Sequence, residues 1–124
     1  MHLIISRSGK PFLSDIMRDF KKFTSVTLLD MIKNESGESR KNWMMWLFNV
    51  AGRENPANVH SQFWQQDNHP EELISNHFMF QKVNYTHYNP VSAGFVDKAE
   101  DYLLSSARDY AGIPGLIDNI QFLL

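Results

Sequence analysis

Apolar side chains recur at roughly three- to four-residue spacing in the stretch LSDIMRDFKKFTSVTLLDMIKN, and this period is typical of one face of an amphipathic helix. Ser14 is the expected N-cap, with Asp15 in the first turn. The helix is expected to end near Asn34, where Glu35-Ser36-Gly37 breaks the pattern. The apolar stripe consists of Ile16, Phe20, Phe23 and Leu28.

Further along the chain the pattern predicts three more helical stretches. One covers residues 40–48 and ends at Gly52, and another covers about 70–89. Pro70 suits a first helical position, the acidic residues at 71 and 72 favour the positive end of the helix dipole, and Pro90 is expected to close the helix at Asn89. The last of the three, at residues 97–112, is expected to be short, and the apolar tail after it is expected to pack back onto the fold.

Two short segments have the character of strands rather than helices. Residues 2–6 are β-rich and are followed by the turn residues Ser8-Gly9-Lys10-Pro11, while residues 60–66 alternate and are aromatic. The resulting order is strand, helix, helix, strand, helix. This order predicts an α+β domain.

Length and composition indicate what kind of chain this is, but they do not indicate its function. The chain has 124 residues, of which 43% are hydrophobic, and it contains no cysteine. These values predict a single globular domain without disulfides or a thiolate metal site. No apolar run is long enough to span a bilayer, and the first residues do not form a signal peptide, so a cytoplasmic protein is expected.

Charge is distributed unevenly along the chain. The net charge is −2, yet residues 1–50 carry a balance of +3 and residues 51–124 a balance of −5. Such a local excess can bind phosphate electrostatically, or it can be an ordinary solvated helix face. The basic residues that fall close together in the first half are Arg7, Lys10, Arg18, Lys21 and Lys22.

The stretch NYTHYNP, residues 84–90, carries the clearest candidate chemistry. Tyr85 and Asn89 are four residues apart and would lie on one face of a helix, with Tyr88 close to that face and His87 turned away. A phenol can attack phosphorus, and an amide oxygen can ligate a hard divalent cation. The alternative is an ordinary helix end with aromatic packing.

The segment KVNYTHYNPVSAGFVDKAEDYLLSSARDYAG resembles the signature YIHxNPVxAGLVxxPEDYxxSSARxYxG of the single-tyrosine HUH transposases. More narrowly, it resembles the REP-associated, insertion-sequence-200-like branch. The likeness continues through FWQQDNHPEEL, LSDIMRDFKKFTS and HLIIS, in the same order as in the family. Thr86 stands where the family usually has isoleucine.

The resemblance implies a ferredoxin-like (RRM-like) α+β domain over residues 1–124, with a helical C-terminal extension at 97–124 that contains the SSAR box. It implies that Tyr85 is the nucleophile and that Asn89 and His2 ligate Mg²⁺ or Mn²⁺. His2 matches the second histidine of the HUH motif, at residues 2–6, and the first has no counterpart. On this likeness we expect an N-terminally truncated copy with impaired activity.

The resemblance implies cleavage and strand transfer of single-stranded or hairpin DNA through a 5′-phosphotyrosine. The protein is expected to act as a monomer or a homodimer. It is expected to be associated with the nucleoid when it is bound to DNA. The alternatives are a non-catalytic nucleic-acid-binding remnant, a co-opted hairpin-DNA-binding protein, and a small interaction domain without a DNA partner. Trp43 and Trp46 are expected in the core, and Arg108 could contact a phosphate or bond to a helix end. The candidate DNA contacts are Arg18, Lys21, Lys22, Ser25, Trp64 and Arg108.

Overall fold

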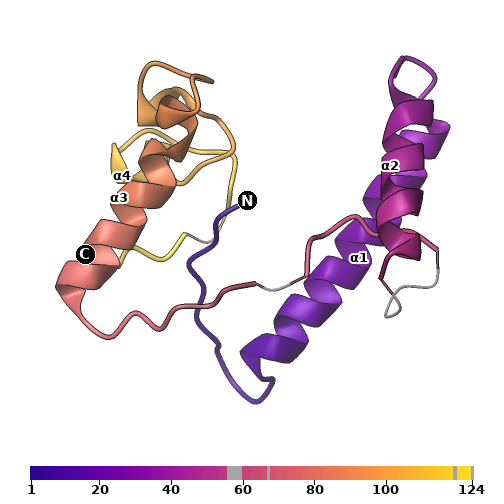
Figure 1. Cartoon of the computed structure of the whole chain (residues 1–124). Coiled ribbons are helices and arrows are strands. Elements are labelled where there is room, and N and C mark those ends of the chain that lie inside the picture. The colour runs from indigo at the N-terminus through magenta and orange to yellow at the C-terminus, as the bar shows by residue number, and fades with distance from the viewer. Residues whose placement is uncertain (56–59, 67, 119, 124) are drawn as a thin grey trace. The chain divides into compact units, whose positions relative to one another are not determined.

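The computed structural model of the chain describes residues 1–55, 60–66, 68–118 and 120–123. It forms two compact units, one made of Met1–Ile5 and Pro70–Leu124 and the other of Ser6–His69. The elements, shown in Figure 1, are α1 (Leu13–Asn34), α2 (Lys41–Arg53), α3 (Asn76–Ser92), the 3₁₀ helix η1 (Ala99–Asp101) and α4 (Ala107–Tyr110).

The described residues contain helices and no strand, so the predicted α+β, ferredoxin-like fold is wrong. Both segments predicted as strands, 2–6 and 60–66, are irregular where they are described. A strand is stable only when a neighbouring strand takes up its backbone N–H and C=O groups. Alternating side chains show that a segment can be extended, but they do not supply that neighbour.

In the unit Ser6–His69, α1 and α2 pack together as a helical hairpin. The turn between them is held by its own polar groups, because the Glu35 backbone N–H donates to the Met31 carbonyl and the Glu35 carboxylate accepts from the Gly37 N–H. Arg40 is paired with Glu38 at 3.0 Å. α1 begins at Leu13 after Phe12, so Ser14 lies inside the helix and is not its cap.

The aromatic segment after α2 lies over this hairpin instead of joining a sheet. The Gln62 N–H donates to the Phe48 carbonyl at 2.8 Å, and the Phe63 ring packs on Phe48 at a centroid distance of 5.1 Å. The Trp64 ring approaches Phe20, and its indole N–H donates to Thr24 Oγ1 at 2.8 Å. The segment is therefore held by side-chain contacts and by isolated backbone hydrogen bonds, not by a ladder of them.

In the other unit, α3 begins at Asn76, later than the predicted start at residue 70. The Ser75 hydroxyl accepts a hydrogen bond from the Phe78 N–H at 3.2 Å and so provides the N-cap. Proline and two acidic residues at 70–72 suit a first helical turn, but an extended segment can carry them equally well. The local capping bond decides where the helix begins.

α3 continues through Pro90 to Ser92, so the predicted end at Asn89 is also wrong. Gly94 adopts a φ of 74°, and the Gly94 N–H donates to the Val91 carbonyl. The Phe95 N–H donates to the Pro90 carbonyl at 2.9 Å. These bonds form a Schellman motif, which takes up the last carbonyls of the helix. Pro90 is tolerated because only its own N–H is missing from the final turn.

His87 of α3 is buried against the C-terminal segment. Its Nε2 lies 3.0 Å from Ser106 Oγ, and its ring contacts the Tyr110 ring edge-on at 5.0 Å. The predicted packing of the C-terminal tail is confirmed at Tyr110, which contacts the Phe122 ring and accepts a hydrogen bond from the Leu123 N–H. Val83 and Ala107 are the buried hydrophobic residues of the described chain.

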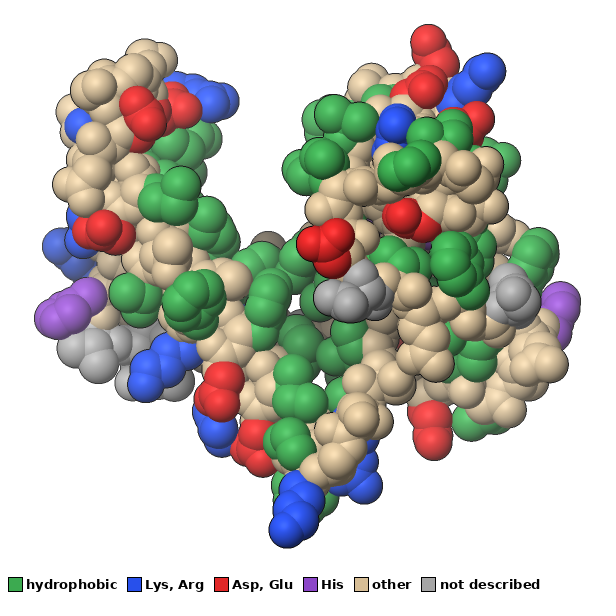
Figure 2. Space-filling view, turned by 180° about the vertical axis from the view of Figure 1, so that it is seen from behind, with side chains coloured by type: hydrophobic (Ala, Val, Ile, Leu, Met, Phe, Trp, Pro, Cys, Tyr) green, Lys and Arg blue, Asp and Glu red, His purple; other side chains and the backbone are tan. Residues whose placement is uncertain are grey.

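Many large apolar side chains lie on the surface of both units, as the space-filling view in Figure 2 shows. Trp43 and Trp46 are each 58% exposed, so the prediction that they form part of the core is wrong. They lie one turn apart on α2, on the side away from its buried Gly52. No helix in the described part of the chain is long and apolar enough to cross a membrane.

Gly52 offers a test of how the aromatic segment is seated on the hairpin. A Cβ at this position would lie 2.6 Å from the Ser61 Cα and 2.7 Å from the His60 carbonyl oxygen. Gly→Ala in an open helix stabilises by about 1 kcal/mol, whereas overpacking against backbone costs about 1–3 kcal/mol. We therefore expect Gly52→Ala to lower the free energy of unfolding in urea. Asn42→Ala, at an exposed position of the same helix, is the control, and stabilisation by both changes would contradict the packing.

His87 predicts a pH dependence of stability. Burial lowers its pKa from the ordinary value of 6.5, so the unfolded chain takes up a proton at higher pH than the folded chain does. The free energy of unfolding should thus fall as the pH decreases from 6.5. We expect His87→Gln to flatten this slope in urea unfolding at about pH 7.5 and about pH 5.5. His77→Gln, at an exposed histidine on the same helix, is the control, and an equal flattening by both changes would contradict the assignment to His87.

Candidate active site

Tyr85 lies on the outer side of α3 because the inner side is fixed by two buried residues. Val83 and His87 are one helical turn apart and are 3% and 8% exposed. In a helix, residues two positions from these point in a different direction. Tyr85, between them in sequence, is consequently 56% exposed and presents its phenol to solvent. The predicted orientation of His87, turned away from Tyr85, is confirmed.

His2 is brought against Tyr85 by the first residues of the chain. The two ring centroids are 5.2 Å apart with an interplanar angle of 83°, an edge-to-face contact. Residues 1–5 belong to the same unit as α3, so this contact lies within one compact body. Two of the three residues that the sequence assigned to the catalytic centre are therefore neighbours, although they are far apart in the chain.

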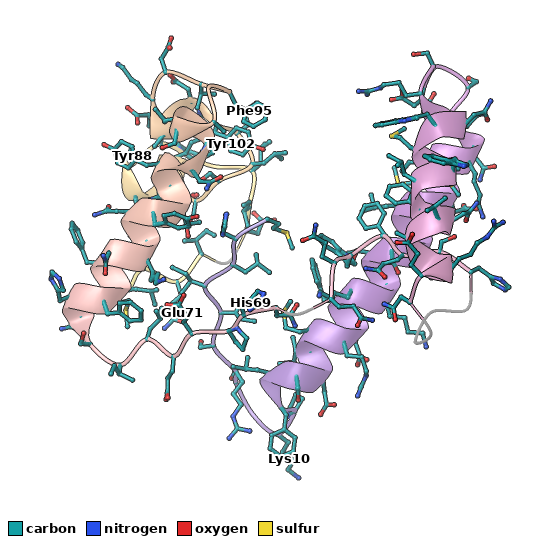
Figure 3. The ribbon with its side chains drawn as sticks, in the orientation of Figure 1. Lys10, His69, Glu71, Tyr88, Phe95 and Tyr102 are labelled. Carbon is teal, nitrogen blue, oxygen red and sulfur yellow. The ribbon has the colours of Figure 1, made fainter. Side chains whose placement is uncertain are left out.

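Asn89 follows Tyr85 by one turn of α3 and is half-buried. Within the described part of the chain, neither the Tyr85 hydroxyl nor the Asn89 amide has a hydrogen-bond partner. Tyr88, labelled in Figure 3, is 60% exposed on the same helix. The arrangement gives an open phenol flanked by an imidazole and an amide, which suits attack on an incoming electrophile.

The same residues do not make a complete metal site. Mg²⁺ requires octahedral coordination by oxygen ligands, several of which can be water. His2 and Asn89 offer one nitrogen and one amide oxygen, and no group of three or more His, Cys, Asp or Glu side chains that could hold an ion is found in the described ranges. We therefore assign no chemical step to Mg²⁺ or Mn²⁺.

The basic candidates on α1 belong to the unit Ser6–His69. Arg18 is paired with both Asp15, at 2.7 Å, and Asp19, at 3.0 Å, so its charge is largely neutralised at the surface. Lys21 Nζ donates to the Gln65 carbonyl and helps to hold the aromatic segment. Lys22 is exposed and is the candidate whose charge remains available to an anion.

The other three DNA-binding candidates are engaged within the protein. Ser25 Oγ donates to the Lys22 carbonyl, and Trp64 is half-buried with its N–H bonded to Thr24. Arg108 donates to the carbonyls of Glu100 and Pro114, both at 3.2 Å. These contacts tie the turns around α4 together, which corresponds to the structural alternative for Arg108.

The sequence reasoning missed one ion pair on the tyrosine helix. Lys82 Nζ lies 2.7 Å from Glu71 Oε2 and 5.1 Å from the centroid of the Phe78 ring. Glu71, labelled in Figure 3, lies in the extended segment before α3. The prediction that it belongs to the first turn of the helix is therefore wrong. Lys82 lies three residues before Tyr85, and this spacing could have identified it from the sequence as a neighbour on the same helix face.

Comparisons with models of protein families, with curated proteins and with solved structures found no match to this chain in any of the three.

Proposed function

We propose that this protein acts on single-stranded DNA as a tyrosine-dependent strand transferase, with Tyr85 as the nucleophile. The observation that carries the proposal is the contact between His2 and Tyr85 beside Asn89, on the exposed face of α3. Tyr85 is 56% exposed, so its phenol is accessible to a substrate. The resemblance of NYTHYNP and SSAR to single-tyrosine HUH transposases supports the same assignment.

The reaction exchanges one phosphodiester for another. Tyr85 Oη attacks the phosphorus, the bond from phosphorus to the 3′ oxygen breaks, and the protein holds a 5′-phosphotyrosine. The phenol proton leaves to solvent, and the departing 3′ oxygen takes up a proton to become a hydroxyl. Because the ester count is unchanged, the 3′-hydroxyl of the same or another strand can reverse the step. His2 and Asn89 flank the phosphate and can orient it by hydrogen bonds.

Covalent capture tests this assignment directly. We expect incubation with a pool of single-stranded hairpin DNAs to give a protein–DNA adduct in intact-mass spectrometry. Tyr85→Phe should abolish the adduct, while Tyr88→Phe, a matched exposed tyrosine on the same helix, should retain it. Parallel samples with Mn²⁺ and with EDTA show whether the reaction requires a recruited ion. An adduct that survives Tyr85→Phe, or absence of any adduct in all wild-type samples, would contradict the proposal.

A second candidate is a protein that binds single-stranded DNA without cutting it. It is favoured by the exposed cation Lys22 on α1, which is followed by the exposed ring of Phe23. An aromatic ring and a free cation together suit a stacked base and its phosphate. In this case Tyr85, His2 and Asn89 would contact DNA without forming a covalent bond.

Salt dependence separates the cations on α1. Each phosphate contact contributes about 0.7 to the slope of log affinity against log salt for single strands. We expect Lys22→Ala to reduce this slope in fluorescence anisotropy with a labelled single-stranded oligonucleotide. Arg18→Ala should change it less, because Asp15 and Asp19 already neutralise that charge. An affinity of the wild type that is indifferent to salt would contradict both DNA functions.

A further inference from the structure

Lys82, Tyr85 and Asn89 lie on one face of α3. They are separated by three and four residues, and the helix is continuous from Asn76 to Ser92. Side chains three or four residues apart on a helix have Cβ atoms about 5–6 Å apart. Lys82 is also the only Lys or Arg in α3, which contains no Asp or Glu. Lys82 is therefore the one Lys or Arg on this face of α3, and it lies one turn before Tyr85, with its ammonium at Phe78 and Glu71.

The ammonium group of Lys82 is held in a defined position. Its Nζ lies 5.1 Å from the centroid of the Phe78 ring and 2.7 Å from Glu71 Oε2. The lysine side chain is 31% exposed, whereas that of Glu71 is 57% exposed. The cation is thus anchored on the helix, while its anionic partner lies in the extended segment and faces solvent.

We infer that Lys82 is a phosphate-binding residue beside Tyr85, and that Glu71 is the anion that a DNA phosphate displaces. The inference rests on the proposed function and identifies the contact that places the phosphate at its nucleophile. A carboxylate and a phosphodiester both accept charge-assisted hydrogen bonds from an ammonium. Replacing the carboxylate costs little, because an ion pair that is open to solvent is only weakly stabilising.

Other cations of this unit are placed differently. Arg108 is committed to the carbonyls of Glu100 and Pro114, and Lys98 precedes η1 on an exposed segment. Neither belongs to α3. Within the described part of the unit, Lys82 is therefore the cation that shares a helix face with Tyr85, and Lys98 is its natural control.

The test compares two changes that break the same ion pair from opposite sides. The probe is a fluorescein-labelled single-stranded hairpin pool, followed by anisotropy across a salt series and by adduct formation. Lys82→Met should weaken binding roughly tenfold, the size of one charge-assisted hydrogen bond, and reduce the salt slope by about 0.7. Lys82→Arg should restore most of the binding. Glu71→Gln should tighten binding by up to about fivefold, because it releases Lys82.

If the ion pair were only structural, Lys82→Met and Glu71→Gln would weaken binding alike, and this result would overturn the inference. Equal effects of Lys82→Met and Lys98→Met would overturn it as well, since both remove one charge from the unit. In either case a wild-type adduct at Tyr85 would leave the proposed function intact. A wild type that neither binds the probe nor forms an adduct removes the proposed function and this inference together. Glu72→Gln controls for the loss of a neighbouring carboxylate.

Discussion

The arrangement of α3 depends on the burial of Val83 and His87. These two residues are one turn apart, and His87 is held by Ser106 and by the edge of Tyr110. Once they face inward, helix geometry leaves no freedom for the residues around them. Lys82, Tyr85 and Asn89 therefore lie on the other side of α3, where Tyr85 is exposed and the other two are half-buried. A modest core of one aliphatic side chain and one hydrogen-bonded imidazole thus determines which chemistry the helix presents.

The same packing explains why the C-terminal segment belongs with the tyrosine helix. Ser106 and Tyr110 meet His87, and the tail returns to Tyr110 through Phe122 and Leu123. Arg108 closes the turns on either side of α4 by bonding to backbone carbonyls. The SSAR box therefore packs against the side of α3 that carries His87. The phenol of Tyr85 can stay exposed to solvent because the helix that carries it is anchored on its other side.

Local sequence rules predicted the helices better than their ends. The apolar stripe from Ile16 to Leu28 gave α1, and the run around Trp43 gave α2, because amphipathic periodicity reflects the helix itself. The ends of α3 were misplaced, because Ser75 and Gly94 cap it more effectively than Pro70 and Pro90 limit it. The strands failed for a different reason. Pairing requires a second segment, and neither 2–6 nor 60–66 has one among the described residues.

The sequence by itself determined the spacing of Tyr85 and Asn89, their position on one helix face, and the orientation of His87 away from them. These relations follow from the period of a single helix and need no other part of the chain. Only the tertiary structure decided that His2 packs against Tyr85 and that Glu71 pairs with Lys82. Both contacts join α3 to irregular segments, whose paths depend on packing and not on a repeating pattern. For the same reason, periodicity could not tell that Trp64 packs on α1 while Trp43 and Trp46 remain exposed.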